Sequence, residues 1–307
     1  MALLQQNCAR IIGPAPLPVK VQMSKSIANA LSDAARVLSE AEVADARREA
    51  AALLTSLLGK DRAFLISHSD EALDDELVKT FEDQVRRRAS GEPLQYITGV
   101  QEFFGLSFEV SPAALIPRPE TEFIVESALE CLATRPEAPL LLDVGTGSGC
   151  ITIALLRERP NARAVAVDVS PAAVALAGRN ARRHAVSERV AFLVADAVSA
   201  LAPRPMFDLI VSNPPYIADE EWETLQREVR DHEPRTALTS GSDGLTMIRR
   251  LVAECAVQLH EGGYLIFEIG YRQQAAVERM INGKVWERIA IRPDLQGIPR
   301  TVVLKKR

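Results

Sequence analysis

The amino-acid sequence predicts an α/β protein with a mostly parallel sheet and an antiparallel last strand, preceded by a small all-helical domain and a β-hairpin connector. Three observations predict this fold class. Apolar residues recur with a helical period over residues 24–90. From Pro139 onward, short apolar runs alternate with helical stretches, as in βαβ units. Two last runs, residues 285–291 and 300–304, lie close together with a glycine and a proline between them, which predicts a closing antiparallel pair.

The N-terminal part divides into a tail and a helical domain. We expect residues 1–22 to be a flexible tail, because they hold three prolines and lack the charged-then-apolar layout of a signal peptide. Residues 23–90 should form the helical domain. One apolar helical face falls within residues 27–38, a second ends at Gly59, a residue type favoured just after a helix, and a third falls within residues 77–85.

Residues 91–118 are expected to form the hairpin connector, and residues 119–307 the second domain. A Gly-Glu-Pro run at 91–93 ends the last helix of the first domain. Residues 103–110 then alternate as a strand does. Two prolines within residues 115–122 enforce an extended path before the next helix begins with acidic residues.

The predicted strands of the second domain are short, continuously apolar runs, which are typical of strands buried on both faces of a parallel sheet. They span residues 140–144, 164–167, 190–193, 209–211 and 264–267. In open sheets of this kind, ligands bind outside the carboxyl ends of the strands. The residues that follow these runs are therefore the first candidates for a functional site.

Composition limits the function classes. The 307 residues are 47% hydrophobic and carry a formal net charge of −5, so no global basic field attracts nucleic acid. No apolar run approaches the roughly 20 residues that span a bilayer. Four cysteines are scattered without a C-x-x-C pair, which predicts reduced thiols and no metal site. We therefore expect a cytoplasmic protein with neither a membrane nor direct nucleic-acid partner.

A glycine-rich turn follows the first predicted strand of the second domain and opens a helix. It consists of Gly145, Thr146, Gly147, Ser148 and Gly149. Glycines let the backbone turn sharply and approach a ligand closely. Asp168 ends the next strand. A carboxylate there can accept hydrogen bonds from both hydroxyls of a ribose.

The spacing of this turn separates two classes of nucleotide-binding enzyme. Nicotinamide and adenosylmethionine enzymes both combine a glycine turn with such an acidic residue. The pattern here is G-x-G-x-G, with Cys150 where the pyrophosphate-binding fingerprint requires Gly or Ala. That difference favours a nucleoside without phosphate. Asp196, which ends the third strand, is placed to reach an adenine amino group; the alternative is that Asp196 caps a helix or turn.

The segment Asn213-Pro214-Pro215-Tyr216 follows a buried-strand pattern at residues 207–212. Two consecutive prolines cannot continue a sheet ladder, so the carbonyls of Asn213 and Pro214 should point outward without partners. The Asn213 amide and the flat ring of Tyr216 complete a constellation that can receive a planar group bearing an NH2. The alternative is a proline-rich turn that only caps the strand.

These motifs together resemble those of class I adenosylmethionine-dependent methyltransferases, which have a Rossmann-like sheet. More narrowly, the chain from about Met23 to Arg307 is similar to the PrmC/HemK family of release-factor glutamine methyltransferases. The segments that carry this resemblance are residues 91–97, 116–122, 143–149, 213–216, 233–234 and 267–270. Asn-Pro-Pro-Tyr alone also occurs in adenine methyltransferases acting on nucleic acid, so it identifies a target amino group and not a substrate.

The resemblance implies that S-adenosyl-L-methionine is the cofactor, held by the glycine turn from Gly145 to Gly149 and by Asp168, Asp196 and Asn213. Ala197 belongs to this cofactor site but departs from the family pattern, because some members carry an aromatic residue there that stacks on adenine. What covers that face of the adenine is therefore left open.

The resemblance also implies the substrate, which is the glutamine of the Gly-Gly-Gln motif in class 1 bacterial peptide chain release factors. The methyl group would go to its side-chain amide nitrogen. Asn213 would bridge cofactor and substrate, and Pro214, Pro215 and Tyr216 would frame the glutamine amide as catalytic and substrate-binding residues. The helical domain at residues 23–90 would recognise the protein substrate.

Three rival interpretations remain. An amino methyltransferase acting on adenine in nucleic acid is the main alternative, disfavoured by the acidic total and the plain helical bundle. A module that binds the cofactor without chemistry is disfavoured by the intact segment 213–216. A nicotinamide dehydrogenase is disfavoured by the early third glycine and by the lack of an acid–base residue for hydride transfer.

Overall fold

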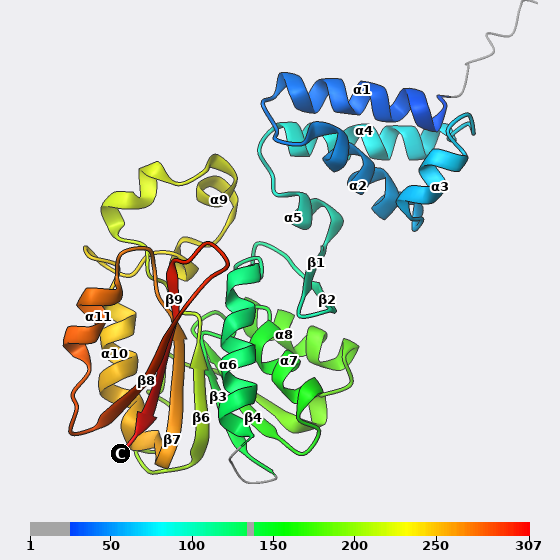
Figure 1. Cartoon of the computed structure of the whole chain (residues 1–307). Helices are drawn as coiled ribbons and strands as arrows, with labels where there is room; N and C mark the ends of the chain where they lie inside the picture. The colour runs from blue at the N-terminus through cyan, green and yellow to red at the C-terminus, as the bar shows by residue number, and fades with distance from the viewer. Residues whose placement is uncertain (1–24, 134–137) are drawn as a thin grey trace, which may run out of the picture.

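The computed structural model describes residues 25–133 and 138–307, so the tail expected at residues 1–22 lies outside the described residues. The first part is helical, with α1 (Ile27–Glu40), α2 (Ala46–Leu58), α3 (Arg62–Ser67) and α4 (Asp75–Ala89). Their apolar faces meet in one core, in which Leu38 and Phe81 are almost completely buried. This region is a separate helical bundle that lies beyond one end of the sheet and is joined to it through α5, β1 and β2 (Figure 1).

A short helix and a hairpin connect the two regions. They are α5 (Leu94–Thr98), β1 (Val100–Phe103) and β2 (Leu106–Glu109), the two strands being antiparallel. The single strand expected over residues 103–110 is wrong, because Phe104 and Gly105 have φ angles of 51° and 69° and turn the chain back. Two successive residues with positive φ are what a tight hairpin turn requires. The alternating hydrophobic residues Phe104, Leu106, Phe108 and Val110 run through the turn and concealed it.

The sheet has seven strands in the order β5-β4-β3-β6-β7-β9-β8. The strands are β3 (Leu140–Val144), β4 (Arg163–Asp168), β5 (Val190–Val194), β6 (Phe207–Ser212), β7 (Leu259–Glu268), β8 (Trp286–Pro293) and β9 (Pro299–Lys306). Only β9 runs against its neighbours, since it pairs antiparallel with both β7 and β8. The predicted fold class, with its antiparallel last strand, is confirmed.

Helices cover both faces of the sheet, which explains the continuous apolar runs of its strands. Five longer helices are α6 (Glu122–Leu132), α7 (Cys150–Glu158), α8 (Pro171–Arg183), α10 (Thr246–Glu254) and α11 (Gln274–Met280). Successive β3 residues point to opposite sides: Leu141 joins the core with Ile153 of α7, and Leu142 joins the core with Ile248 of α10. Within the described residues, no helix has both the length and the apolar character needed to cross a bilayer.

The remaining elements are short. They are α9 (Arg227–His232) and the 3-10 turns η1 (Pro119–Thr121), η2 (Ser187–Arg189), η3 (Asp219–Thr224), η4 (Arg235–Ala237) and η5 (Cys255–Gln258). The segment from η3 to η4 follows β6 and lies beyond the carboxyl ends of the strands, on the side of the helical region (Figure 1). Arg88 of α4 and Glu228 of α9 form an ion pair at 2.9 Å that joins the two parts. The segment from η3 to η4 therefore covers the carboxyl ends of the strands.

Candidate active site

The glycine turn presents its backbone at the carboxyl end of β3. Gly145 and Gly147 have φ angles of 76° and 56°, in the left-handed region that side chains disfavour. The backbone N–H groups of Gly145 and Thr146 both donate to the carbonyl of Val167 at 2.9 Å, which ties the turn to β4. A Cβ atom on Gly145 would meet no other atom within 4 Å and would project into open space. The turn is thus a cradle that a bound group can fill.

Gly149 has a different place in the same turn. It precedes α7 with a φ angle of 83°, and a Cβ atom there would lie 3.1 Å from both Ala177 and Ile153. Gly149 therefore allows close packing of α7 on α8 and does not line the cavity. Asn180 of α8 supports the turn, because its amide donates to the carbonyl of Ser148 at 2.9 Å.

Asp168 lies at the end of β4 and faces the glycine turn. One carboxylate oxygen accepts the N–H of Gly147 and the other accepts the N–H of Ser170, both at 2.9 Å. These two hydrogen bonds fix the orientation of the carboxylate, which can accept about four hydrogen bonds in all. Further acceptor positions therefore stay available on the cavity side, where Asp168 is one of the lining residues.

Asp143 lies beneath the turn and is completely enclosed. Its Oδ2 accepts hydrogen bonds from the hydroxyls of Thr146 at 2.8 Å and Thr152 at 2.6 Å. Its Oδ1 has no hydrogen-bond partner among the described residues. Burial raises the pKa of Asp143 to about 6, the two threonine hydroxyls oppose this rise, and the nearby Asp168 adds to it.

Asp196 and Ala197 also line the cavity. The Asp196 carboxylate is well exposed and pairs with Arg250 of α10 at 2.7 Å. Ala197 is 7% exposed and has a φ angle of 51°. Met247 of α10 and the exposed Val169 are further lining residues that were not predicted. No signal in the sequence singled out Met247, because it comes from a helix fifty residues later in the chain.

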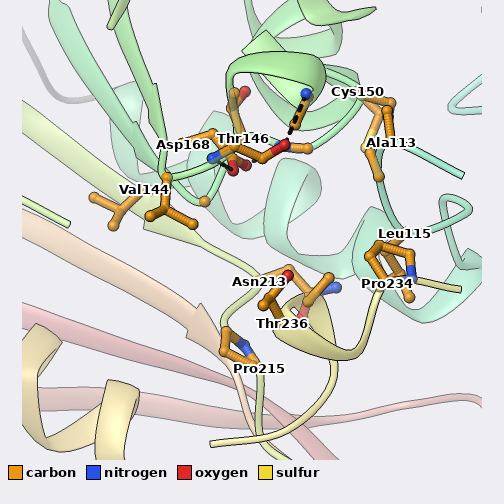
Figure 2. A pocket seen from close by; sticks show the side chains of 18 of the residues that line it. Ala113, Leu115, Val144, Thr146, Cys150, Asp168, Asn213, Pro215, Pro234 and Thr236 are labelled. Atoms are coloured by element: carbon orange, nitrogen blue, oxygen red, sulfur yellow. Dashed lines mark hydrogen bonds between the residues drawn. The ribbon is translucent and has the colours of Figure 1, made fainter. Parts of the chain in front are cut away.

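Asn213 and Pro215 face the glycine turn from the opposite side of the cavity (Figure 2). The Asn213 Nδ2 group donates to the Thr121 hydroxyl at 2.9 Å. Its Oδ1 and the main-chain carbonyls of Asn213 and Pro214 accept no hydrogen bond from any described residue. The two main-chain carbonyls are unpaired, as the two consecutive prolines predicted.

Pro214 and Tyr216 do not line the cavity. Pro214 is buried, and Tyr216 packs on the apolar core beside α10. The Tyr216 hydroxyl donates to Glu268 of β7 at 3.0 Å. Burial raises the pKa of Tyr216, so the phenol stays protonated as a donor. Its ring therefore supports the segment from behind instead of presenting a face to the cavity.

The cavity has a volume of about 420 Å³ and is closed by two segments from outside the sheet. The connector supplies one wall through Ala113 and Leu115, and the stretch after α9 supplies the other through Pro234 and Thr236 (Figure 2). Sequence reasoning missed these walls, although residues 116–122 and 233–234 carried part of the family resemblance.

A buried carboxylate joins these two walls. The Glu233 side chain is 1% exposed and forms an ion pair with Arg118 of the connector. Its second oxygen accepts the N–H of Ile116 at 3.1 Å. The connector and the segment after α9, more than a hundred residues apart, are thereby held together over the cavity.

The arrangement has one side for a nucleoside and one side for an amide. The glycine cradle and Asp168 offer close backbone approach and carboxylate acceptors for ribose hydroxyls. Asn213 offers an unpaired amide oxygen about which a planar NH2 group can be oriented. Both sides line one cavity, so a donor and an acceptor held there are adjacent. These properties fit S-adenosylmethionine beside an amide substrate.

Comparison with known proteins identifies the family. Residues 29–99 match the PrmC N-terminal domain, and residues 125–250 match the methyltransferase small domain. A release factor glutamine methyltransferase of Koribacter versatilis is 42% identical over 281 residues, which cover 92% of this chain and 99% of that protein. One from Geobacter sulfurreducens is 45% identical, covering 86% and 91%. The chain belongs to the release factor glutamine methyltransferase family.

A solved structure with a similar fold is the hMettl16 catalytic domain in complex with MAT2A 3′UTR hairpin 1. It has a TM-score of 0.53 at 15% identity, covering 82% of this chain and 90% of that one. At this identity the likeness concerns the fold alone.

Proposed function

We propose that this protein transfers the methyl group of S-adenosyl-L-methionine to the side-chain amide nitrogen of the glutamine in the Gly-Gly-Gln motif of class 1 bacterial release factors, in the cytoplasm. The observation that carries the proposal is the single cavity shared by the glycine cradle and the unpaired Oδ1 of Asn213. Family membership supports the same substrate.

The cofactor side of the site consists of residues that fix position. We assign the backbone of Gly145 to Ser148 to the amino-acid and ribose parts of S-adenosylmethionine, and Asp168 to its ribose hydroxyls. Gly149 acts by holding α7 against α8. Asp196, Ala197 and Met247 border the space for the adenine. When bound, the cofactor supplies a sulfonium methyl that is already activated for transfer.

The substrate side orients a weak nucleophile. An amide nitrogen is a poor nucleophile because its lone pair is delocalised into the carbonyl. Asn213 Oδ1 accepts one N–H group of the glutamine. The unpaired main-chain carbonyl of Pro214, which lies between the lining residues Asn213 and Pro215, accepts the other, although the Pro214 ring itself is buried. Together they fix the nitrogen in line with the methyl carbon. Such positioning is worth roughly 7–11 kcal/mol in well-oriented systems. Pro215 and Tyr216 make the backbone around Asn213 and Pro214 rigid. Residues 23–90 recognise the release factor.

No basic side chain is needed in this reaction. An alkylated amide nitrogen is very acidic, so its proton leaves to water once the new N–C bond forms. The described residues that line the cavity include no histidine or lysine, and their only cation is Arg118, which is paired with Glu233. Orientation and fixed dipoles in an enclosed site therefore supply the rate enhancement.

The proposal is tested by giving the full chain methyl-labelled S-adenosylmethionine together with either a purified class 1 release factor or DNA. We expect label in the release factor alone, and mass spectrometry should place one methyl group on the glutamine of the Gly-Gly-Gln motif. Label in DNA alone would contradict the proposal and support the adenine methyltransferase alternative.

A further inference from the structure

A chain of hydrogen bonds runs behind the cavity from Asn213 to a buried carboxylate. Glu268 is the last residue of β7 and is 2% exposed. Its Oε2 accepts the Thr121 hydroxyl at 2.8 Å, and its Oε1 accepts the Tyr216 hydroxyl at 3.0 Å. Thr121, also 2% exposed, in turn accepts the Nδ2 group of Asn213 at 2.9 Å. The reaction described above makes no use of Glu268.

The direction of these bonds is set by the carboxylate. An ionised carboxylate accepts hydrogen bonds and donates none, whereas a hydroxyl has a single proton. The proton of Thr121 is therefore committed to Glu268, and the Thr121 oxygen can only accept from Asn213. The Asn213 amide must then turn its NH2 toward Thr121. Its Oδ1 is left as the end that faces the cavity.

We propose that Glu268 is a positioning residue that, through Thr121, fixes the orientation of the Asn213 amide and so keeps Oδ1 as the acceptor for the substrate N–H. This inference rests on the proposed function, because the acceptor role of Asn213 is part of it. Without the carboxylate, the two orientations of the asparagine amide differ little. In the flipped orientation an NH2 would face the NH2 of the substrate, and two donors cannot bond.

The isosteric variant Glu268→Gln isolates this effect. Its NH2 can donate to Thr121, which frees the Thr121 proton to donate to Asn213 Oδ1 and reverses the chain. The shape of the buried side chain is preserved. We expect kcat for release-factor methylation to fall roughly 10- to 100-fold, the cost of one lost or opposed hydrogen bond in the transition state. The Kd for S-adenosylmethionine should change less than about threefold, since the glycine cradle is untouched.

Thr121 provides a second, independent variant. Thr121→Val keeps the shape but removes the relay hydroxyl, and should lower kcat as Glu268→Gln does. Thr121→Ser keeps the hydroxyl and should retain most of the activity that Thr121→Val loses. The kcat of the double variant Glu268→Gln/Thr121→Val should be no lower than that of either single variant, because both substitutions interrupt the same chain of hydrogen bonds. Asp208→Asn is the matched control: Asp208 is a buried strand carboxylate that accepts the N–H of Leu140 at 3.0 Å and does not line the cavity.

The pH profile distinguishes positioning from a merely structural role. Burial raises the pKa of Glu268, opposed by the Thr121 and Tyr216 hydroxyls and by Arg300 of β9, with Glu120 of η1 adding to the rise. When acid protonates Glu268, its proton can donate to Thr121 and reverse the chain. Wild-type kcat should therefore fall as the pH falls through this pKa. In Glu268→Gln the fall should be absent and kcat should be low throughout.

The experiment uses the full chain, a purified release factor and labelled S-adenosylmethionine, with kcat, KM, cofactor affinity and thermal unfolding measured for each variant. Wild-type kcat and an unchanged pH profile in both Glu268→Gln and Thr121→Val would overturn the inference. So would a loss confined to cofactor affinity. If Glu268→Gln does not fold, the kcat and pH profile of Thr121→Val alone test the inference. Failure of the proposed function is distinct, because the wild-type protein would then leave the release factor unmethylated.

Discussion

Asn213 and Asp168 face one cavity from opposite sides, and each is held by hydrogen bonds that leave part of its side chain free. Asp168 accepts the N–H groups of Gly147 and Ser170, and Asn213 donates to Thr121. In the proposed reaction, Asp168 binds the cofactor and Asn213 binds the substrate amide. Substitutions at them should separate catalysis from cofactor binding.

Replacing Asn213 by alanine should abolish most methyl transfer and leave cofactor binding largely intact. The variant removes the side-chain acceptor for the substrate amide, which should cost roughly 10²- to 10³-fold in kcat, the effect of losing one preorganised hydrogen-bonding group. Single-turnover methylation of a release factor measures the loss, and calorimetry measures cofactor affinity. A normal methylation rate would show that Asn213 has no such role.

Asp168→Ala should instead weaken cofactor affinity first. The carboxylate is the acceptor that we assign to the ribose hydroxyls, and hydrogen bonds to a charged group are worth about 1.5–3 kcal/mol, or roughly 10- to 100-fold in Kd. Asp168→Asn is the matched control, because it keeps one acceptor oxygen for Gly147 or Ser170. An unchanged Kd by calorimetry would remove Asp168 from the ribose site.

Asp143 should make the stability of the cofactor-free protein depend on pH. Its folded-state pKa is raised to about 6. The protonated form therefore favours folding, and this contribution is present in full below about pH 4 and is lost as the pH rises through 6. The free energy of unfolding should fall by up to roughly 3 kcal/mol more in wild type than in Asp143→Asn over that range. Urea unfolding at a series of pH values measures both slopes, and equal slopes would contradict the assignment.

At the scale of elements, the sheet was predictable and the walls of the cavity were not. Continuous apolar runs identify buried parallel strands, and the glycine turn and the prolines after β6 mark two strand ends directly. The inward turn of Tyr216 depends on Glu268, 52 residues later. The turn at Phe104 and Gly105 was hidden because a hydrophobic alternation runs from Phe104 to Val110 without a break. Local patterns contain no information about such contacts between distant segments.

The ion pair that closes the cavity gives an element-scale prediction. Arg118→Ala leaves the Glu233 carboxylate, 1% exposed, without its counter-charge between the connector and the segment after α9. Because the Arg118 side chain is itself 34% exposed, the loss should cost up to about 3 kcal/mol of stability, at the low end of the roughly 3–5 kcal/mol for a fully buried pair. Arg36→Ala is the control, since the Arg36–Glu40 pair is 63% and 64% exposed and should cost less than about 1 kcal/mol. Equal losses in chemical denaturation would contradict the role of Glu233.

At the scale of the whole molecule, the helical region is linked to the segment that covers the cavity. The Arg88 side chain is 9% exposed and pairs with both Glu49 of α2 and Glu228 of α9. The same segment continues through Glu233 to the cavity wall at Pro234. The helical region is therefore tied by an ion pair to the segment that supplies one wall of the cavity. The division of the chain at residues 90 and 118 stays a prediction, since family matches at 29–99 and 125–250 do not define those boundaries.

The most direct measurement compares two release factors that differ only in the glutamine of the Gly-Gly-Gln motif, one wild type and one with glutamate there. Each is incubated with the full chain and S-adenosylmethionine, and the intact mass is recorded with time. The glutamine protein should gain one methyl group on the side-chain nitrogen, and the glutamate protein should gain none, because it offers no N–H to Asn213. Equal methylation of both would contradict an acceptor site built for an amide.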